Sequence, residues 1–201
     1  MKVPDIPSAP ASGGGLKEGE KAFRQLKDPI LQTLELIRRA APERTGPYSL
    51  AREWVWSLAG TPPAKGGKTS IPAPGTRDVT LWEAMASKGE WTELLHSAEG
   101  RWPKTIFWLD PHRYVGLALS ELGLEEAHSA VAGGVARLLE RLPGLAELTF
   151  ADGTPIADED TLAWVKKHAP SSGMGTSAST PVPMPPMPVM QTGGGELSLP
   201  E

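Results

Sequence analysis

The sequence predicts a mostly helical protein, a bundle of paired antiparallel helices with one short β-hairpin near residues 148–156. Apolar residues recur at every third or fourth position through most of residues 16–169, and this is the period of amphipathic helices. The joints between these stretches are short, which favours antiparallel neighbours. Asp152-Gly153 stands between two short stretches and predicts the turn of the hairpin.

Two linkers flank the predicted helical domain. Residues 1–15 contain three prolines and end in three glycines, and residues 170–201 combine a proline- and methionine-rich run with another glycine run. Such segments bury too little apolar surface to offset the entropy of ordering. We therefore expect a folded helical domain at 16–169 between two linkers, which is typical of one module of a longer protein. The methionines at 174–190 are alternatively a peptide motif that binds a partner.

The first predicted helix spans about residues 17–41 and is interrupted at Asp28-Pro29. A proline inside a helix costs about 3 kcal/mol, so we expect either a kink or a restart with Asp28 as the cap. The residues of its predicted apolar face are Phe23, Leu26, Ile30, Leu34 and Ile37.

The second predicted helix spans about residues 47–59, with Pro47 in its first turn and Gly60 as its stop. Trp56 points away from the predicted core face of this helix. Tryptophan is enriched at interface hot spots, so Trp56 is either an interface residue or part of a second core layer, and we take it as the candidate interface residue. The predicted core face consists of Leu50, Ala51, Trp54, Val55 and Leu58.

Further helices are predicted in the rest of the domain. Asp110-Pro111 is expected to cap or bend one of them, which gives Asp110 a structural role. Gly133-Gly134 weakens another by about 1 kcal/mol per glycine relative to alanine, so we expect a second helix to approach closely there. The predicted ranges are about 78–88, 90–101, within 105–122, 124–142 and 158–168.

Asp152 and Gly153 have a predicted structural role in the hairpin. We expect a type I′ or related tight turn that orients the last helix, because only small residues tolerate a positive φ there.

Composition and charge exclude several classes of protein. The net charge of −4 gives no basic field for nucleic acid, and the absence of cysteine excludes disulfides and thiolate metal sites. No stretch approaches 18 apolar residues, so we expect no membrane insertion. The N-terminus lacks the apolar core of a secretory signal. A cytoplasmic protein is therefore expected.

The motifs of catalysis and cofactor binding are incomplete in this sequence. Residues 64–69 end in Gly-Lys-Thr as a phosphate loop does, but Pro62 occupies the position of the first glycine and no strand precedes it. No two histidines have the helical spacing of a zinc site, and no nucleophile elbow is present. We predict no enzyme, and no catalytic, cofactor-binding or metal-binding residue. The histidines are His96, His112, His128 and His168.

Residues 105–165 contain the most informative sequence. The pattern runs FWLD-x-x-R-x-V-x-x-A-L, then LPGL-x-x-L-x-F-x-D-G-x-P-x-A-D, then a closing Trp164. This order resembles the TssA proteins of bacterial type VI secretion systems, also called the ImpA or VasJ family. The resemblance extends over roughly residues 16–168 and corresponds to the family's middle helical domain.

The resemblance implies a function in assembly. It implies a non-enzymatic structural component of the secretion tail whose partners are the baseplate, the contractile sheath and the inner tube. It also implies self-association, and a dimer through an apolar helical face is the expectation for this chain. The alternative is a helical adaptor that binds a peptide or a partner helix in another pathway.

Overall fold

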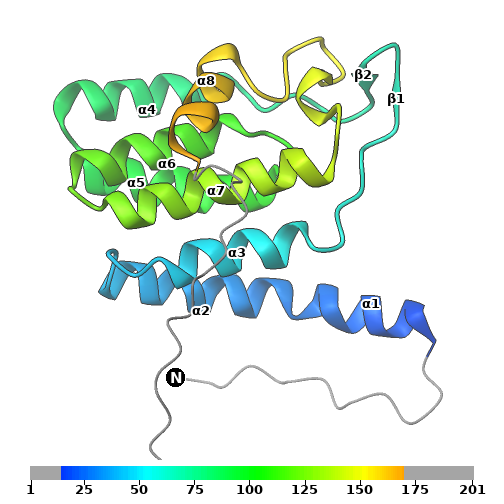
Figure 1. Ribbon diagram of the computed structural model, residues 1–201, viewed down its shortest axis with the longest axis horizontal. Coiled ribbons are helices and arrows are strands. Elements are labelled where there is room, and N and C mark those ends of the chain that lie inside the picture. The colour runs from blue at the N-terminus through cyan, green and yellow to red at the C-terminus, as the bar shows by residue number, and fades with distance from the viewer. Residues whose placement is uncertain (1–14, 170–201) are drawn as a thin grey trace, which may run out of the picture. The chain divides into compact units, whose positions relative to one another are not determined.

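The computed structural model of the chain describes residues 15–169 (Figure 1). The predicted linkers, and with them the methionine-rich run, lie outside the described residues except for Gly15. The described residues are mostly helical and include one short two-stranded antiparallel hairpin, so the predicted fold class is confirmed. No helix within 15–169 is long and apolar enough to cross a membrane.

Helices α1 (Leu16–Gln25) and α2 (Lys27–Ala40) meet at Leu26, which confirms a restart in the first predicted helix. Asp28 is not its cap, because α2 starts directly after Leu26 and has no side-chain cap. The first backbone N–H groups of a helix have no partner within it, so Pro29 is tolerated in the first turn. The helix therefore begins ahead of the Asp-Pro pair.

Helix α3 (Gly46–Trp56) buries a different face from the predicted one. Leu50 and Leu58 are each 47% exposed, whereas Trp56 is 3% exposed. Arg52, which is not part of the predicted core face, is fully buried. The interface assignment of Trp56 is therefore wrong, and its ring belongs to the core. The buried residues of α3 are Pro47, Tyr48, Ala51, Arg52 and Trp56.

The two-stranded sheet lies in the loop after α3, whereas the hairpin predicted at 148–156 occurs as an isolated antiparallel bridge between Thr149 and Pro155. Strands β1 (Ala64–Lys65) and β2 (Lys68–Thr69) pair antiparallel. The residues between them, Gly66 and Gly67, have φ of 58° and 77°, and positive φ at both central positions is the requirement of a type I′ turn. The Gly-Lys-Thr sequence is thus part of a tight hairpin.

The remaining helices form the main packed body. Helices α5, α6 and α7 pack successively against one another, α4 packs on α5, and α8 packs on α6 and α7. Helix α3 contacts both α2 and α7 (Figure 1). The bounds are α4 (Arg77–Lys88), α5 (Trp91–Arg101), the 3₁₀ turn η1 (Trp102–Lys104), α6 (Asp110–Glu121), α7 (Glu125–Arg141), the 3₁₀ turn η2 (Leu145–Glu147) and α8 (Glu159–His168).

A close helix contact at Gly134 confirms the expectation drawn from the paired glycines of α7. A Cβ atom at Gly134 would lie 2.8 Å from Cδ of Arg52. The missing side chain lets the aliphatic part of the Arg52 side chain lie against the backbone of α7. The contact positions α3 beside α7 and helps bury the arginine.

Residues 148–156 reverse direction through a three-residue loop. The backbone N–H of Phe150 donates to the carbonyl oxygen of Thr154 at 2.8 Å, and that of Gly153 donates to the carbonyl oxygen of Phe150 at 3.0 Å. Gly153 has φ of 97°, whereas no non-glycine residue within 15–169 has a positive φ. A type I′ turn at Asp152-Gly153 is therefore wrong. A turn closed by a left-handed glycine is the related form that occurs.

Candidate functional site

A cluster of buried charged and polar side chains connects α2, α3, α5 and α6. It consists of Arg38, Arg52, Glu99 and His112, and is called the charge cluster below. Nη2 of Arg52 lies 2.6 Å from Oε1 of Glu99, and Nε of Arg38 lies 3.5 Å from Oε2. Nη2 of Arg52 also lies 3.0 Å from Nδ1 of His112. All four residues are less than 9% exposed, so each charge depends on its neighbours for stabilisation.

The ionisation of the charge cluster follows from its geometry. Burial alone would raise the pKa of Glu99, but Arg52 and Arg38 outweigh it and lower that pKa below the ordinary value. Burial and then the charge of Arg52 lower the pKa of His112 well below its ordinary value, so the ring is neutral near pH 7. Because Arg52 can only donate, Nδ1 of His112 accepts and its proton is on Nε2.

Aromatic rings surround the charge cluster. Nε1 of Trp102 donates to Oε2 of Glu99 at 3.2 Å, and the guanidinium of Arg52 lies 5.0 Å from the centre of the Trp102 ring. The ring of Trp56 meets that of His112 edge-on at 5.2 Å, and its Nε1 donates to the carbonyl oxygen of Ile106 at 2.9 Å. These contacts explain why Trp56 is in the core.

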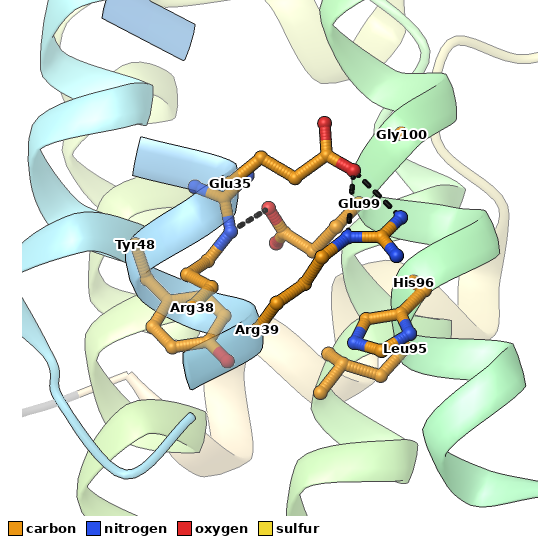
Figure 2. A pocket seen from close by; sticks show the side chains of 8 residues that line it. All are labelled: Glu35, Arg38, Arg39, Tyr48, Leu95, His96, Glu99 and Gly100. Carbon is orange, nitrogen blue, oxygen red and sulfur yellow. Dashed lines mark hydrogen bonds and ion pairs between the residues drawn. The ribbon is translucent and has the colours of Figure 1, made fainter. Parts of the chain in front are cut away.

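The cavity beside the charge cluster is too small for a substrate. Its volume is about 10 Å³, roughly the space that one water molecule needs. Figure 2 shows two ion pairs among its lining residues, Arg38 with Glu99 and Arg39 with Glu35, and Oε1 of Glu35 lies 2.7 Å from Nη2 of Arg39. Burial raises the pKa of Tyr48, which also lines this cavity, so its phenol stays protonated. The arrangement serves to join helices.

A larger groove lies between α3 and α7, and it is called the α3–α7 groove below. Its volume is about 380 Å³, within the range of sites that bind ligands or peptide side chains. Nη2 of Arg141 donates to the carbonyl oxygen of Trp56, the last residue of α3, at 2.5 Å. Nη2 of Arg137 lies 3.4 Å from Oε1 of Glu53. The lining residues are Arg52, Glu53, Trp56, Ser57, Gly134, Arg137, Leu138 and Arg141.

Asp110 has a structural position but does not cap its own helix. Leu109 is the residue before α6, and no side chain caps that helix. The carboxylate of Asp110 accepts hydrogen bonds from Nε1 of Trp108 at 2.8 Å, from the backbone N–H of Asp158 at 2.9 Å and from Oγ1 of Thr161 at 2.9 Å. Asp110 does not cap α6 because its carboxylate turns toward donors at the start of α8, Asp158 and Thr161, which are distant in sequence.

Arg113 completes the connection between α6 and α8. Its Nη2 lies 2.9 Å from Oδ2 of Asp158, and Oδ1 of Asp158 accepts the backbone N–H of Thr161 as the cap of α8. Asp110 and Arg113 of the FWLDPHR sequence thus supply the α6 side of the contact between α6 and α8.

A second contact of α8 brings together two histidines, and the sequence analysis did not predict that they lie close to each other. The ring of His128 on α7 lies 4.4 Å from that of His168, and its Nε2 accepts from Nε1 of Trp164 at 2.9 Å. The Trp164 ring lies over Gly116, where a Cβ atom would be 2.4 Å from the ring. Within residues 15–169 no group of three or more His, Asp or Glu side chains could hold a metal ion.

The charge cluster was missed by the sequence analysis, although a signal for it exists. Arg38, Arg52 and Glu99 each lie four residues after a buried apolar residue of the same helix. These three apolar residues are Leu34, Tyr48 and Leu95. Charged residues within apolar stripes of three helices indicate an internal ion pair network.

Comparison with known proteins identifies the family of the chain. No curated protein matches it. The family model described as "Type VI secretion, EvfE, EvfF, ImpA, BimE, VC_A0119, VasJ" matches residues 20–192 of the 201 residues. This match contains the FWLDPHR sequence, the 148–156 turn and α8. The chain therefore belongs to the ImpA/VasJ family of type VI secretion, as its resemblance to TssA proteins implied.

Proposed function

We propose that this chain is a non-enzymatic assembly component of the type VI secretion tail, where it acts by binding other tail proteins. The observation that carries the proposal is the match to the secretion family over residues 20–192. Two features of the structure support it. The buried charged groups are used in contacts between helices, and the α3–α7 groove has the size of a site for a polypeptide side chain.

The proposed partners are the baseplate, the contractile sheath and the inner tube, together with a second copy of the chain. A cytoplasmic location belongs to the same proposal. The exposed Leu50 of α3 and Leu58 of the turn that follows it support self-association, since burying them would remove apolar surface from water. Residues 16–169 would form the folded module, with linkers on both sides.

The proposal is tested by following sheath assembly in the host. Deletion of the encoding gene should abolish or sharply reduce the assembly of a fluorescently tagged sheath, and re-expression should restore it. Purified chain should also bind at least one of the purified baseplate, sheath or inner-tube proteins. Sheaths of normal number and length in the deletion strain would contradict the proposal.

Self-association has its own measurement. Analytical ultracentrifugation of the purified chain should show a dimer that forms as the concentration rises into the micromolar range. A chain that stays monomeric at high micromolar concentration would refute the dimer and leave the assembly function to be decided by the sheath experiment.

A further inference from the structure

Helix α8 is held on the helix bundle at both of its ends, where it packs on α6 and α7 (Figure 1). The residue that caps its start is held by Asp110 and Arg113 of α6. Its second half carries Trp164 and His168, which meet the ring of His128 on α7. The helix has 10 residues, and an isolated helix of that length is marginal in water. These contacts therefore decide whether α8 stays in place.

The contact between α7 and α8 requires one form of the His128 ring. His128 is 3% exposed, and its Nε2 lies 2.9 Å from Nε1 of Trp164. An indole N–H can only donate, so Nε2 accepts and the ring is neutral in this arrangement. Its proton is then on Nδ1, which lies 3.4 Å from Oε2 of Glu125. Docking of α8 thus depends on the neutral ring with its proton on Nδ1.

A second proton on His128 would oppose the contact. The N–H at Nε2 would face the N–H of Trp164, so two donors would meet and a buried hydrogen bond would be lost. The indole has little room to move toward α6, because its ring fills the space over Gly116 that a Cβ atom would need. The charged ring would also be held away from water. Separation of α8 from α7 relieves all three effects.

The titratable groups that face His128 come from α7 and α8. On α7, Glu125 attracts a charged ring, but its side chain is 67% exposed, so water weakens the attraction. On α8, the His168 ring lies 4.4 Å from that of His128 and follows Lys167. Burial first, and then the charges of His128 and Lys167, lower the pKa of His168. From α6, the uncharged hydroxyl of Ser120 donates to Glu125 at 3.0 Å.

We propose that the contact between α7 and α8 is a pH-sensitive device, in which protonation of His128 releases the second half of α8 from α7. Above about pH 6.5, where histidines lose their charge, Trp164 donates to the neutral ring and α8 stays docked. As the pH falls below this value, the released state binds the proton more readily than the docked state, so release becomes more favourable. The inference goes beyond the proposed assembly function and does not depend on it.

Two measurements on the full 201-residue chain between about pH 7.5 and 5.5 test the device. Nitrogen NMR of the four histidine rings gives the protonation of each, and the signal that is lost in His128→Gln identifies His128. Hydrogen exchange of α8 amides, corrected for the pH dependence of chemical exchange, gives the docking of α8. The amides of α5 in the same protein are the reference for global unfolding.

The wild type should show the Nδ1 proton on His128 at about pH 7.5. Between about pH 6.5 and 5.5, the protection of α8 relative to α5 should fall roughly five- to tenfold, since tenfold is the limit for one proton per pH unit. The ring signal and the protection of α8 should change over the same pH range.

His128→Gln should keep α8 docked and remove most of its pH response, because the amide oxygen accepts from Trp164 without titrating. The matched control is His96→Gln, a half-buried histidine on α5, and its α8 should respond to pH as in the wild type. Circular dichroism checks that both variants are folded. If His128→Gln leaves α8 undocked at every pH, the two wild-type titrations decide the proposal.

Three outcomes would overturn the device: a His128 ring with its proton on Nε2 at about pH 7.5, α8 protection that does not fall relative to α5 by about pH 5.5, or a full pH response in His128→Gln. None of these outcomes affects the assembly function, because that function is decided by sheath formation in the deletion strain.

Discussion

Two carboxylates are buried within residues 15–169, and they are stabilised in different ways. Glu99 on α5 is 4% exposed and lies between two arginines, with Arg52 at 2.6 Å and Arg38 at 3.5 Å. Asp110 on α6 is 8% exposed and accepts three hydrogen bonds, from Trp108, Asp158 and Thr161. Arg113, one turn further along α6, pairs with Asp158 instead.

The pKa values follow this difference. The two arginines lower the pKa of Glu99 against the effect of burial. At Asp110, burial is the largest influence and raises the pKa in spite of the hydrogen bonds. Ionised Glu99 therefore stabilises the fold, whereas ionised Asp110 is held at some cost by donors that also position the start of α8. Hydrogen bonds from neutral groups thus compensate burial less well than adjacent cations do.

The largest effect is expected at Glu99. Glu99→Gln leaves two buried arginines without their counter-charge, and breaking one partner of a buried pair costs roughly 3–5 kcal/mol. The free energy of unfolding from urea titration at pH 7 measures it. The matched control is Glu35→Gln, which breaks the exposed pair with Arg39 and should cost about 1 kcal/mol or less. Equal losses for the two variants would show that burial of the charge cluster does not determine its contribution.

A smaller effect is expected at Asp110. Asp110→Asn keeps the oxygen that accepts from Asp158 and Thr161, and it removes a charge that burial disfavours. Its NH2 group then faces the N–H at Nε1 of Trp108, so two donors meet and that hydrogen bond is lost. We expect a loss of about 1–3 kcal/mol, the cost of one badly matched buried hydrogen bond. Urea unfolding gives the stability, and hydrogen exchange of α8 amides should show faster opening of that helix. A loss as large as that of Glu99→Gln would remove the distinction between the two carboxylates.

The same two regions show how much of the structure could be predicted from the sequence. The Asp110 region contains two local signals, a proline after an acidic residue and an Asp-Gly turn. With the helical period, these signals predicted α6, the chain reversal and α8 near their observed positions. Two of the three partners of Asp110 are 48 and 51 residues away, so no local signal gives their contact. The sequence therefore indicated that Asp110 was structural but not what it holds.

The charge cluster was harder to predict because its members resemble surface residues. Arg52 and Glu99 are 47 residues apart, and each is a common choice for the exposed face of a helix. The predicted core face of α3 omitted Arg52 and was therefore rotated away from Trp56, which is buried. A buried ion pair thus changes the apparent phase of the apolar stripe on the helix that carries it.

The smallest effect concerns the pH dependence of the charge cluster. The folded protein holds His112 neutral, since its pKa is well below the ordinary value of 6.5, whereas the unfolded chain binds a proton near that value. The stability from this residue is therefore fully present above about pH 6.5 and is lost as the pH falls, by at most about 1.4 kcal/mol per pH unit for one proton.

His112→Gln should remove this contribution while keeping an acceptor for Arg52. The measurement is the free energy of unfolding of both proteins at several pH values between about 7.5 and 5.5. Over this range the wild type should lose roughly 1 kcal/mol more than the variant. His96 and His168, whose pKa values are also lowered, first by burial, are present in both proteins and cancel in the difference. Parallel pH profiles would mean that His112 becomes protonated within the folded protein, and the charge cluster would then contain a third positive charge beside Glu99.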